Sequence, residues 1–149
     1  MEARKRSWSS GKKALLFDRD GTLNEDNGYT YRTKDLVWKP GSLDLIKKLN
    51  DLNYLVIVIT NQAGIAKGMF SEAEMHSFHG FMQIELNKRG AHIDQFYYCP
   101  FHKDGIVKKY AIDSNDRKPK TGRLDKISRE WNIEKKNKRK NREKERNSE

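Results

Sequence analysis

Cysteine and long hydrophobic runs are nearly absent from this chain of 149 residues. Cys99 is the single cysteine, so no disulfide can form within the chain, and a reducing compartment fits this composition. The basic N-terminal stretch is followed by only four apolar residues, ALLF, before Asp18. This run is too short for a signal segment, and no stretch approaches the length of a membrane-spanning helix. We therefore expect a soluble, cytoplasmic protein without a membrane partner.

Excess positive charge is confined to the two ends of the chain. The formal net charge is +10, but residues 1–13 hold five Lys/Arg and one Glu, and residues 134–149 hold eight Lys/Arg and four Glu. The remaining 18 basic and 16 acidic residues leave the body nearly neutral. We expect a basic tail (1–12), one folded core (13–133) and a basic C-terminal tail (134–149) that has no apolar face to bury and is disordered. Nucleic acid would bind such tails only non-specifically.

Apolar runs alternate with helical patterns along the core. The runs that predict strands lie at 14–18, 55–60 and 93–98. The alternation predicts an α/β fold with a doubly wound, Rossmann-like parallel sheet. In such sheets, chemistry gathers beyond the carboxyl ends of the strands.

Two helices are predicted between these strands, at 41–52 and 71–89. Ser71 and Glu74 form a capping-box pattern at the start of the second helix, and Gly90 is a stop signal. The apolar helix faces are expected to contain Leu43, Leu45, Ile46, Leu49, Leu52, Phe78, Phe81, Met82, Ile84 and Leu86. The histidines that we expect on the surface are His76, His79 and His92.

Residues 15–22 read LLFDRDGT, an apolar strand that ends on two carboxylates, Asp18 and Asp20, and then turns on a glycine. Like charges this close are costly unless a cation, a ligand or a reaction needs them. A calcium loop is excluded, because an EF-hand counted from Asp18 would place Leu23 and Tyr29 where Gly and Glu are required. Two interpretations stay open. One is a structural turn. The other is a phosphoryl-transfer site in which Asp18 attacks phosphorus, Asp20 moves the proton and Mg²⁺ screens the charges.

Three motifs resemble those of the haloacid dehalogenase-like (HAD) phosphatases. FDRDGTLNEDNGY is similar to the first motif of subclass III, which includes the heptose bisphosphate and histidinol-phosphate phosphatases. ITNQAGIAKG resembles the second motif and DRKPKTG the third, in the family's order, and the resemblance covers residues 13–133. It implies a HAD-like phosphate-monoester hydrolase without a large cap domain, Mg²⁺ held by Asp18 and Asp20, and an aspartyl-phosphate intermediate.

The same resemblance assigns residues to the phosphate and the substrate. Thr60, Asn61 and Gln62 of the second motif and Lys118 of the third would hold the phosphoryl group. Arg117 would recognise the substrate. A hydroxyl, a fixed lysine and a metal around an Asp nucleophile supply the positioning and charge neutralisation that phosphoryl transfer requires.

The expected substrate is D-glycero-D-manno-heptose 1,7-bisphosphate, a small sugar phosphate. Asp26, Gly28 and Tyr29, in a small flap over residues 22–38, are similar to the substrate loop of heptose bisphosphate phosphatases. Histidinol-phosphate phosphatase is a distant alternative, because those relatives differ in this loop. Polynucleotide 3′-phosphatase is another, although its first motif usually reads Asp-Leu-Asp and a DNA groove should charge the body rather than the ends.

The chain departs from the subclass in the loop that often binds zinc. Cys99 begins this loop as in the relatives, but Phe101 stands where a histidine is expected, and Ser114 and Asp116 replace later cysteines. Structural zinc strongly prefers Cys and His. We therefore expect no zinc, with Cys99 and His102 as the weak candidates for such a site.

The fourth motif of the family, an apolar strand ending in Gly-Asp that supplies a third metal-binding carboxylate, is also missing. The helix-like RLDKISREWNI is followed by EKKNKRKNREKERNSE. We therefore expect a C-terminally truncated or frameshifted chain with an exposed apolar edge at 14–18 and impaired activity. An inactive remnant, or a module that binds nucleic acid or a partner, is the alternative, and a partner chain could also complete the sheet. The oligomeric state stays open, with a monomer as the simplest expectation.

Overall fold

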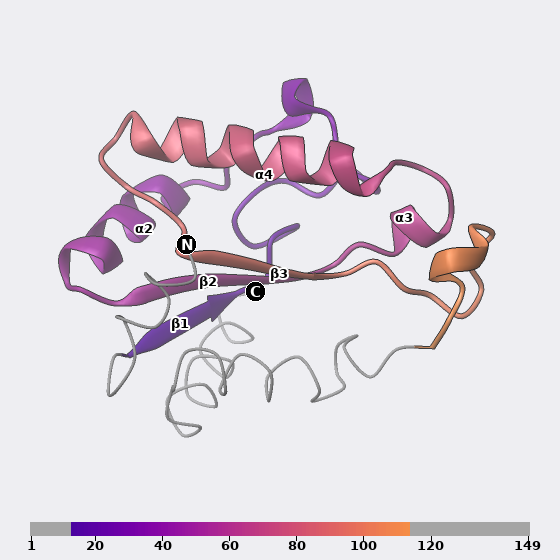
Figure 1. Cartoon of the computed structure of the whole chain (residues 1–149). Helices are drawn as coiled ribbons and strands as arrows, with labels where there is room; N and C mark the ends of the chain where they lie inside the picture. Colours follow the sequence, from indigo (N-terminus) through magenta and orange to yellow (C-terminus); the bar gives the residue numbers. More distant parts are fainter. Residues whose placement is uncertain (1–12, 114–149) are drawn as a thin grey trace.

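A parallel sheet of three strands forms the centre of the structure, a computed structural model that describes residues 13–113 (Figure 1). The strands β1 (Ala14–Phe17), β2 (Leu55–Asn61) and β3 (Gln95–Cys99) lie in the order β1-β2-β3. β2 is buried over almost its whole length, as its apolar, β-branched sequence requires. Because all three strands are parallel, their carboxyl ends meet at one edge of the sheet. The predicted α/β class is thus confirmed.

Helices α2 (Ser42–Asp51) and α4 (Glu72–Asn87) lie on the same face of the sheet (Figure 1). A short helix, α3 (Ala63–Ala66), follows β2 directly and was not predicted. The 3-10 turns η1 (Thr33–Asp35) and η2 (Lys108–Tyr110) lie in the loops. The buried core between sheet and helices consists of Leu23, Ile46, Leu49, Val56, Val58, Leu86, Ala91 and Ile93.

The predicted capping box at the start of α4 is confirmed, and the helix ends at Asn87, two residues before the predicted end. The Ser71 amide donates to the Glu74 carboxylate at 2.9 Å, and the Glu74 amide donates to the Ser71 hydroxyl at 3.1 Å, which is a complete capping box. Just beyond the helix, Gly90 adopts a φ of 72°, a conformation that favours glycine.

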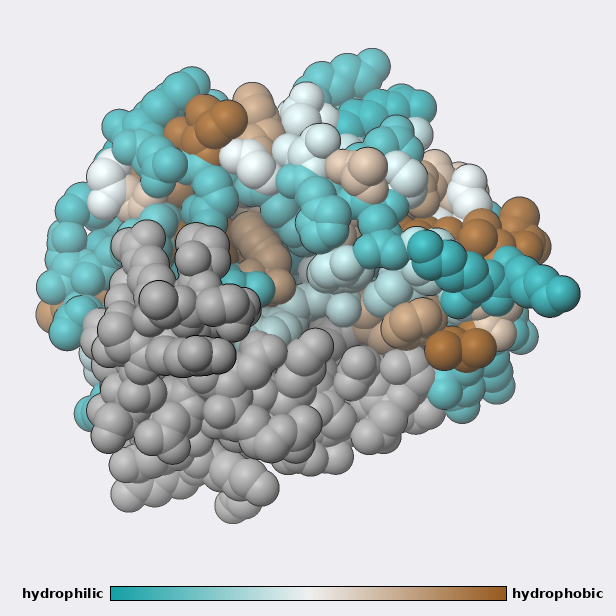
Figure 2. Space-filling view, viewed as in Figure 1, coloured by the Kyte–Doolittle hydropathy of each residue, from teal (hydrophilic) through white to brown (hydrophobic). Residues whose placement is uncertain are grey.

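Some predictions about helix faces were wrong. The side chains of Leu45, Leu52 and Ile84 are 44%, 57% and 54% exposed. Figure 2 shows hydrophobic spots scattered over a largely hydrophilic face of the molecule. Conversely, His79 was expected on the surface and is 6% exposed. The buried stripe of each helix is narrower than the full set of its apolar residues. In α4 it consists of Met75, Phe78, His79, Met82 and Leu86.

The connection between β1 and α2 leaves the sheet as the small flap predicted at 22–38. Its base is closed by two backbone hydrogen bonds, from the Glu25 amide to the Val37 carbonyl at 2.7 Å and from the Lys39 amide to the Leu23 carbonyl at 2.8 Å. The flap therefore starts and returns at the carboxyl end of β1. No large cap domain is present within residues 13–113.

None of the helices in the described part of the chain is long and apolar enough to cross a membrane. The predicted tails (1–12 and 134–149), the third motif with Arg117 and Lys118, and the segment where a fourth motif was sought lie outside the described residues.

Candidate active site

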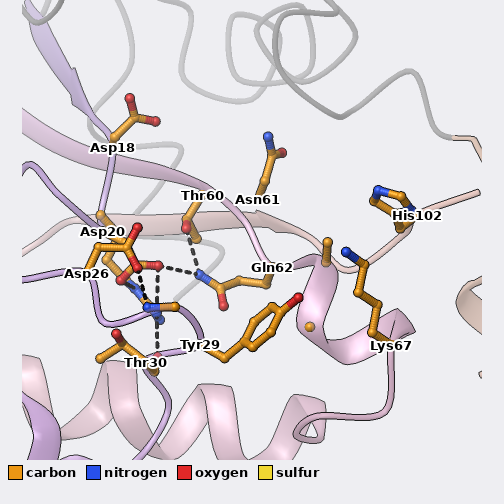
Figure 3. A pocket seen from close by; sticks show the side chains of 14 residues that line it. Asp18, Asp20, Asp26, Tyr29, Thr30, Thr60, Asn61, Gln62, Lys67 and His102 are labelled. Atoms are coloured by element: carbon orange, nitrogen blue, oxygen red, sulfur yellow. Dashed lines mark hydrogen bonds and ion pairs between the residues drawn. The ribbon is translucent and has the colours of Figure 1, made fainter. Parts of the chain in front are cut away.

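A cavity of about 340 Å³ opens at the carboxyl edge of the sheet (Figure 3). Its walls come from the ends of β1 and β2, the flap, α3 and the loop after β3. The lining residues are Asp18, Arg19, Asp20, Asp26, Gly28, Tyr29, Thr30, Thr60, Asn61, Gln62, Ala63, Gly64, Lys67 and His102. The structure thus brings together every residue within 13–113 that was predicted to take part in catalysis or to bind substrate, phosphate or Mg²⁺.

The turn after β1 sets the two aspartates. Gly21 adopts a φ of 84°, which a glycine reaches without steric cost, and its amide donates to the Asn24 carbonyl at 2.7 Å. The Leu23 amide returns to the Arg19 carbonyl at 2.9 Å. This tight turn keeps Asp18 and Asp20 at the end of the strand, where both line the same cavity.

The Asp20 carboxylate accepts four hydrogen bonds. Oδ1 accepts from Arg19 Nε at 2.9 Å and from Asn24 Nδ2 at 3.0 Å. Oδ2 accepts from Arg19 Nη2 at 3.0 Å and from Gln62 Nε2 at 3.3 Å. Because a carboxylate has about four lone-pair sites, its acceptor capacity is filled. The cost of placing Asp20 near Asp18 is therefore offset by a guanidinium and two amides.

Arg19 lies at the centre of this hydrogen-bond arrangement, and we did not predict a role for it from the sequence. Its side chain is fully buried, its Nη2 also donates to the Thr30 carbonyl of the flap at 2.7 Å, and its guanidinium lies 4.6 Å from the Phe78 ring centroid. Its Nη1 lies 3.1 Å from Nε2 of His79. One buried cation thus links β1, the flap and α4.

His79 is neutral in this site. Burial, and next the positive charge of Arg19, hold its pKa well below the ordinary value. Because an arginine only donates, Nε2 must accept, and we assign the ring proton to Nδ1. The ring stacks on Phe96 with 4.0 Å between centroids.

The end of β2 contributes a hydroxyl and an amide. Thr60 is 3% exposed, and its Oγ1 accepts from Gln62 Nε2 at 2.8 Å. The same nitrogen reaches Asp20, so Gln62 connects the ends of β1 and β2 across the cavity floor (Figure 3). The polar groups predicted from two separate motifs therefore form one hydrogen-bonded unit.

The flap is held by local hydrogen bonds. The Gly28 amide donates to Asp26 Oδ1 at 3.0 Å, and the Thr30 hydroxyl donates to Asn27 Oδ1 at 2.7 Å. Tyr29, 41% exposed, lies so close to Gly64 that a Cβ there would be 2.8 Å from its ring. The flap and α3 thus define the width of the cavity together.

Two basic side chains lie at the end of the cavity opposite Asp18, and the sequence analysis gave neither a role in substrate binding. Lys67 follows α3, and His102 comes from the loop after β3 (Figure 3). His102 Nδ1 accepts from the Asp104 amide at 3.0 Å. Cys99, the other weak zinc candidate, is buried, and within residues 13–113 no three His, Cys, Asp or Glu side chains form a metal-binding group.

A larger cavity, of about 690 Å³, shares Asp20 with the first. Its other charged lining residue is Lys39, and the rest includes Phe17, Leu23 and Pro40. The larger volume therefore favours this second cavity as a binding site, whereas the polar lining favours the first. We assign the site to the smaller one, because it gathers the hydroxyl, amide and carboxylate groups.

Comparison with known proteins agrees with this site. The sequence pattern of the family described as polynucleotide kinase 3 phosphatase matches residues 13–144. The chain belongs to this family of HAD-like phosphatases. It is similar to D-glycero-beta-D-manno-heptose-1,7-bisphosphate 7-phosphatases, at 37% identity over 123 residues for the protein of Rhodopseudomonas palustris and 41% over 123 residues for that of Pasteurella multocida. Each alignment covers 83% of this chain.

The structure of this phosphatase-family chain also resembles a solved one. The crystal structure of D,D-heptose 1,7-bisphosphate phosphatase from B. bronchiseptica, complexed with magnesium and phosphate, matches with a TM-score of 0.73 and 30% identity over 81% of this chain. The chain spans about two thirds of these proteins: 68% and 66% of the two sequences and 64% of the solved chain.

Proposed function

We propose that this chain hydrolyses sugar phosphate monoesters, with D-glycero-D-manno-heptose 1,7-bisphosphate as the substrate. The observation that carries the proposal is the meeting of Asp18, Asp20 and Thr60, from the ends of two strands, in one polar cavity. The names of the similar proteins support the substrate. We prefer this activity to the alternative of a module that binds nucleic acid or a partner through a basic tail, because binding through a tail would not require such a cavity.

Asp18 is the nucleophile in this proposal. One of its carboxylate oxygens forms a bond to phosphorus as the bond from phosphorus to the sugar oxygen breaks. Asp20 gives its proton to the leaving sugar oxygen, and then takes a proton from the water that attacks the aspartyl-phosphate. The products are the sugar and inorganic phosphate, and Asp18 and Asp20 return to their starting states.

Asp20 Oδ2 is the oxygen that we assign to this proton. Its contact with Gln62 Nε2, at 3.3 Å, is the longest of the four hydrogen bonds that the carboxylate accepts. A rotated Gln62 amide would present its oxygen to a protonated Oδ2. Arg19 and Asn24 meanwhile keep Oδ1 in place.

The donor chemistry of the cavity fits Mg²⁺. This ion prefers oxygen ligands and is usually bound by one or two carboxylates together with phosphate oxygens and waters. Asp18 would hold it first, because the Asp20 carboxylate is already filled by nitrogen donors. Bound there, Mg²⁺ would neutralise charge on the phosphoryl group. Lys118, with Asn61 and Thr60, would complete the phosphoryl site, and Arg117 would recognise the substrate.

A bisphosphate carries a second anionic group away from the reacting one. Lys67 and His102, opposite Asp18, supply donors for this end of the substrate. Asp26, Gly28 and Tyr29 of the flap would then contact the sugar between the two phosphates. This division predicts that loss of Lys67 weakens binding of a bisphosphate more than binding of a monophosphate.

Phosphate release from heptose 1,7-bisphosphate and from an aryl phosphate tests the proposal. We expect release that requires Mg²⁺, stops with a chelator and is abolished in Asp18→Asn. Lys67→Met should raise KM for the bisphosphate more than KM for the aryl phosphate. A folded wild-type chain that releases no phosphate from either compound, with Mg²⁺ present, would reject the proposed activity.

The remaining expectations complete the proposal. We place the reaction in the cytoplasm, because the single cysteine, Cys99, is a buried free thiol that a reducing compartment preserves. We keep the expectations of no zinc, of a monomer and of only non-specific attraction of nucleic acid to the tails. Gel filtration with light scattering, and binding to DNA at rising salt, test the last two.

A further inference from the structure

The buried Arg19 guanidinium divides its donors among three partners: its neighbour Asp20, Thr30 of the flap, and His79 of α4. Nε and Nη2 hold Asp20, Nη2 also reaches the Thr30 carbonyl, and Nη1 reaches Nε2 of His79. The Arg19 side chain has no exposed surface, so water cannot readily replace a lost partner. Each of the three contacts therefore constrains the same rigid plane.

The plane matters because a guanidinium moves as one body. A change at Nη1 tilts Nε and Nη2 together, and these are the atoms that bind the two oxygens of Asp20. His79, which is not among the residues that line the cavity, supplies the acceptor for Nη1, and its ring stacks on Phe96. A buried, charged N–H group without an acceptor is costly. When His79 no longer accepts from Nη1, we therefore expect the guanidinium plane to shift toward another acceptor.

We infer that His79 is a positioning residue: the acceptor at its Nε2 fixes the Arg19 guanidinium, which in turn fixes the Asp20 carboxylate toward the cavity. The inference rests on the proposed role of Asp20 as acid and base. His79 does not line the cavity, so it acts through Arg19 and not on the substrate itself.

Two substitutions separate the hydrogen bond of His79 from its packing. His79→Gln keeps an acceptor near the position of Nε2 but loses the aromatic ring. His79→Phe keeps a ring that can stack on Phe96 but has no acceptor. His76→Gln, on the exposed side of the same helix, is the matched control. Stability is measured by urea unfolding, and kcat and KM by phosphate release.

The two His79 variants should rank differently in kcat and in stability. His79→Phe should lower kcat by about 10- to 100-fold, as mispositioned catalytic groups do, with KM changed less than about threefold. His79→Gln should lose less kcat than His79→Phe, although it loses at least as much stability. Wild-type kcat in a folded His79→Phe, or kcat that falls in step with stability in both variants, would overturn the inference.

A second readout does not depend on activity. Exchange of the Arg19 Nε–H with solvent, followed by NMR, should be slow in the wild type and in His79→Gln, and faster in His79→Phe. A wild type that releases no phosphate would reject the proposed function, while equal exchange rates in all three proteins would overturn the role of His79.

Should His79→Phe not fold, the ¹⁵N spectrum of the wild-type His79 ring decides. An unprotonated Nε2 supports the inference, and a protonated Nε2 overturns it.

Discussion

The Arg19 guanidinium and the Asp20 carboxylate meet along their edges, with Nε 2.9 Å from Oδ1 and Nη2 3.0 Å from Oδ2. The two residues are neighbours in the sequence, yet the Arg19 side chain is fully buried and that of Asp20 remains 19% exposed. The Asp20 carboxylate is therefore partly accessible to water in the cavity, whereas the Arg19 guanidinium has no exposed surface. This asymmetry determines what each substitution should cost.

Removal of Asp20 should destabilise the fold as well as stop the reaction. Asp20→Ala leaves a buried, unpaired guanidinium, and should lower the free energy of unfolding by about 3 kcal/mol. Arg19→Met should cost less, because methionine fills part of the volume and the remaining carboxylate has access to water. Asp26→Ala, which removes an exposed carboxylate from the flap, is the control and should cost under about 1 kcal/mol. Urea unfolding that gives equal losses for Asp20→Ala and Asp26→Ala would contradict this account.

The close approach of Gly64 to the flap gives a second prediction. A Cβ at Gly64 would lie 2.4 Å from the Phe70 ring and 2.8 Å from the Tyr29 ring, so Gly64→Ala should displace both and cost about 1–3 kcal/mol. It should also raise KM, because Tyr29 lines the cavity. Gly80→Ala, in α4 with open space around it, should instead stabilise by about 0.5–1 kcal/mol. Equal stability changes in the two variants would show that the contact is unimportant.

Much of the site followed from strand order alone. Asp18 and Thr60 stand at the ends of predicted strands, and in a parallel sheet such ends share one edge. That rule needs no knowledge of side-chain packing. It placed Asp20 and Gln62 near one another although 42 positions separate them.

The residues behind the site were harder to predict. Arg19 and His79 are 60 positions apart, and polar residues on a helix are usually exposed. A signal was nevertheless present, because His79 is four residues after Met75 and three before Met82, on the stripe that the helix buries. α3 gave no such signal, because four residues are too few to show helical periodicity. Lys67, which follows it, was therefore not connected with the cavity.

Mild acid should weaken the fold through His79. Its pKa is far below 6.5 in the folded state, so the unfolded chain binds more protons below that pH. The free energy of unfolding should then fall as pH drops below 6.5, by up to about 1.4 kcal/mol per pH unit. Urea unfolding at several pH values should show a smaller slope in His79→Gln than in the wild type. Equal slopes in wild type and His79→Gln would contradict a buried, neutral His79.

A cluster away from the cavity joins α4 to η2. The hydroxyls of Tyr98 and Tyr110 both donate to the Glu72 carboxylate at the start of α4. The hydrogen bond from Tyr110, and next that from Tyr98, lowers the pKa of Glu72. Burial, and next the bond to Glu72, raises the pKa of Tyr98 to about 12. The hydrogen bond between Tyr98 and Glu72 should therefore be lost both in acid, where Glu72 gains a proton, and in alkali, where Tyr98 loses one.

Glu72→Gln should test both limits. A lowered Glu72 pKa adds stability that is complete above its ordinary value of 4.5 and is lost as pH falls further, whereas a raised Tyr98 pKa adds stability that is complete below pH 10 and is lost toward 12. Wild type should therefore exceed Glu72→Gln by about 1 kcal/mol at pH 7, with the gap closing near pH 3 and above pH 11. Glu85→Gln, which removes a single bond to Lys88 on the surface of the same helix, is the control and should change little at any of these pH values. Thermal unfolding across this range checks the prediction, and a gap that stays constant with pH would show that the carboxylate acts only through its shape.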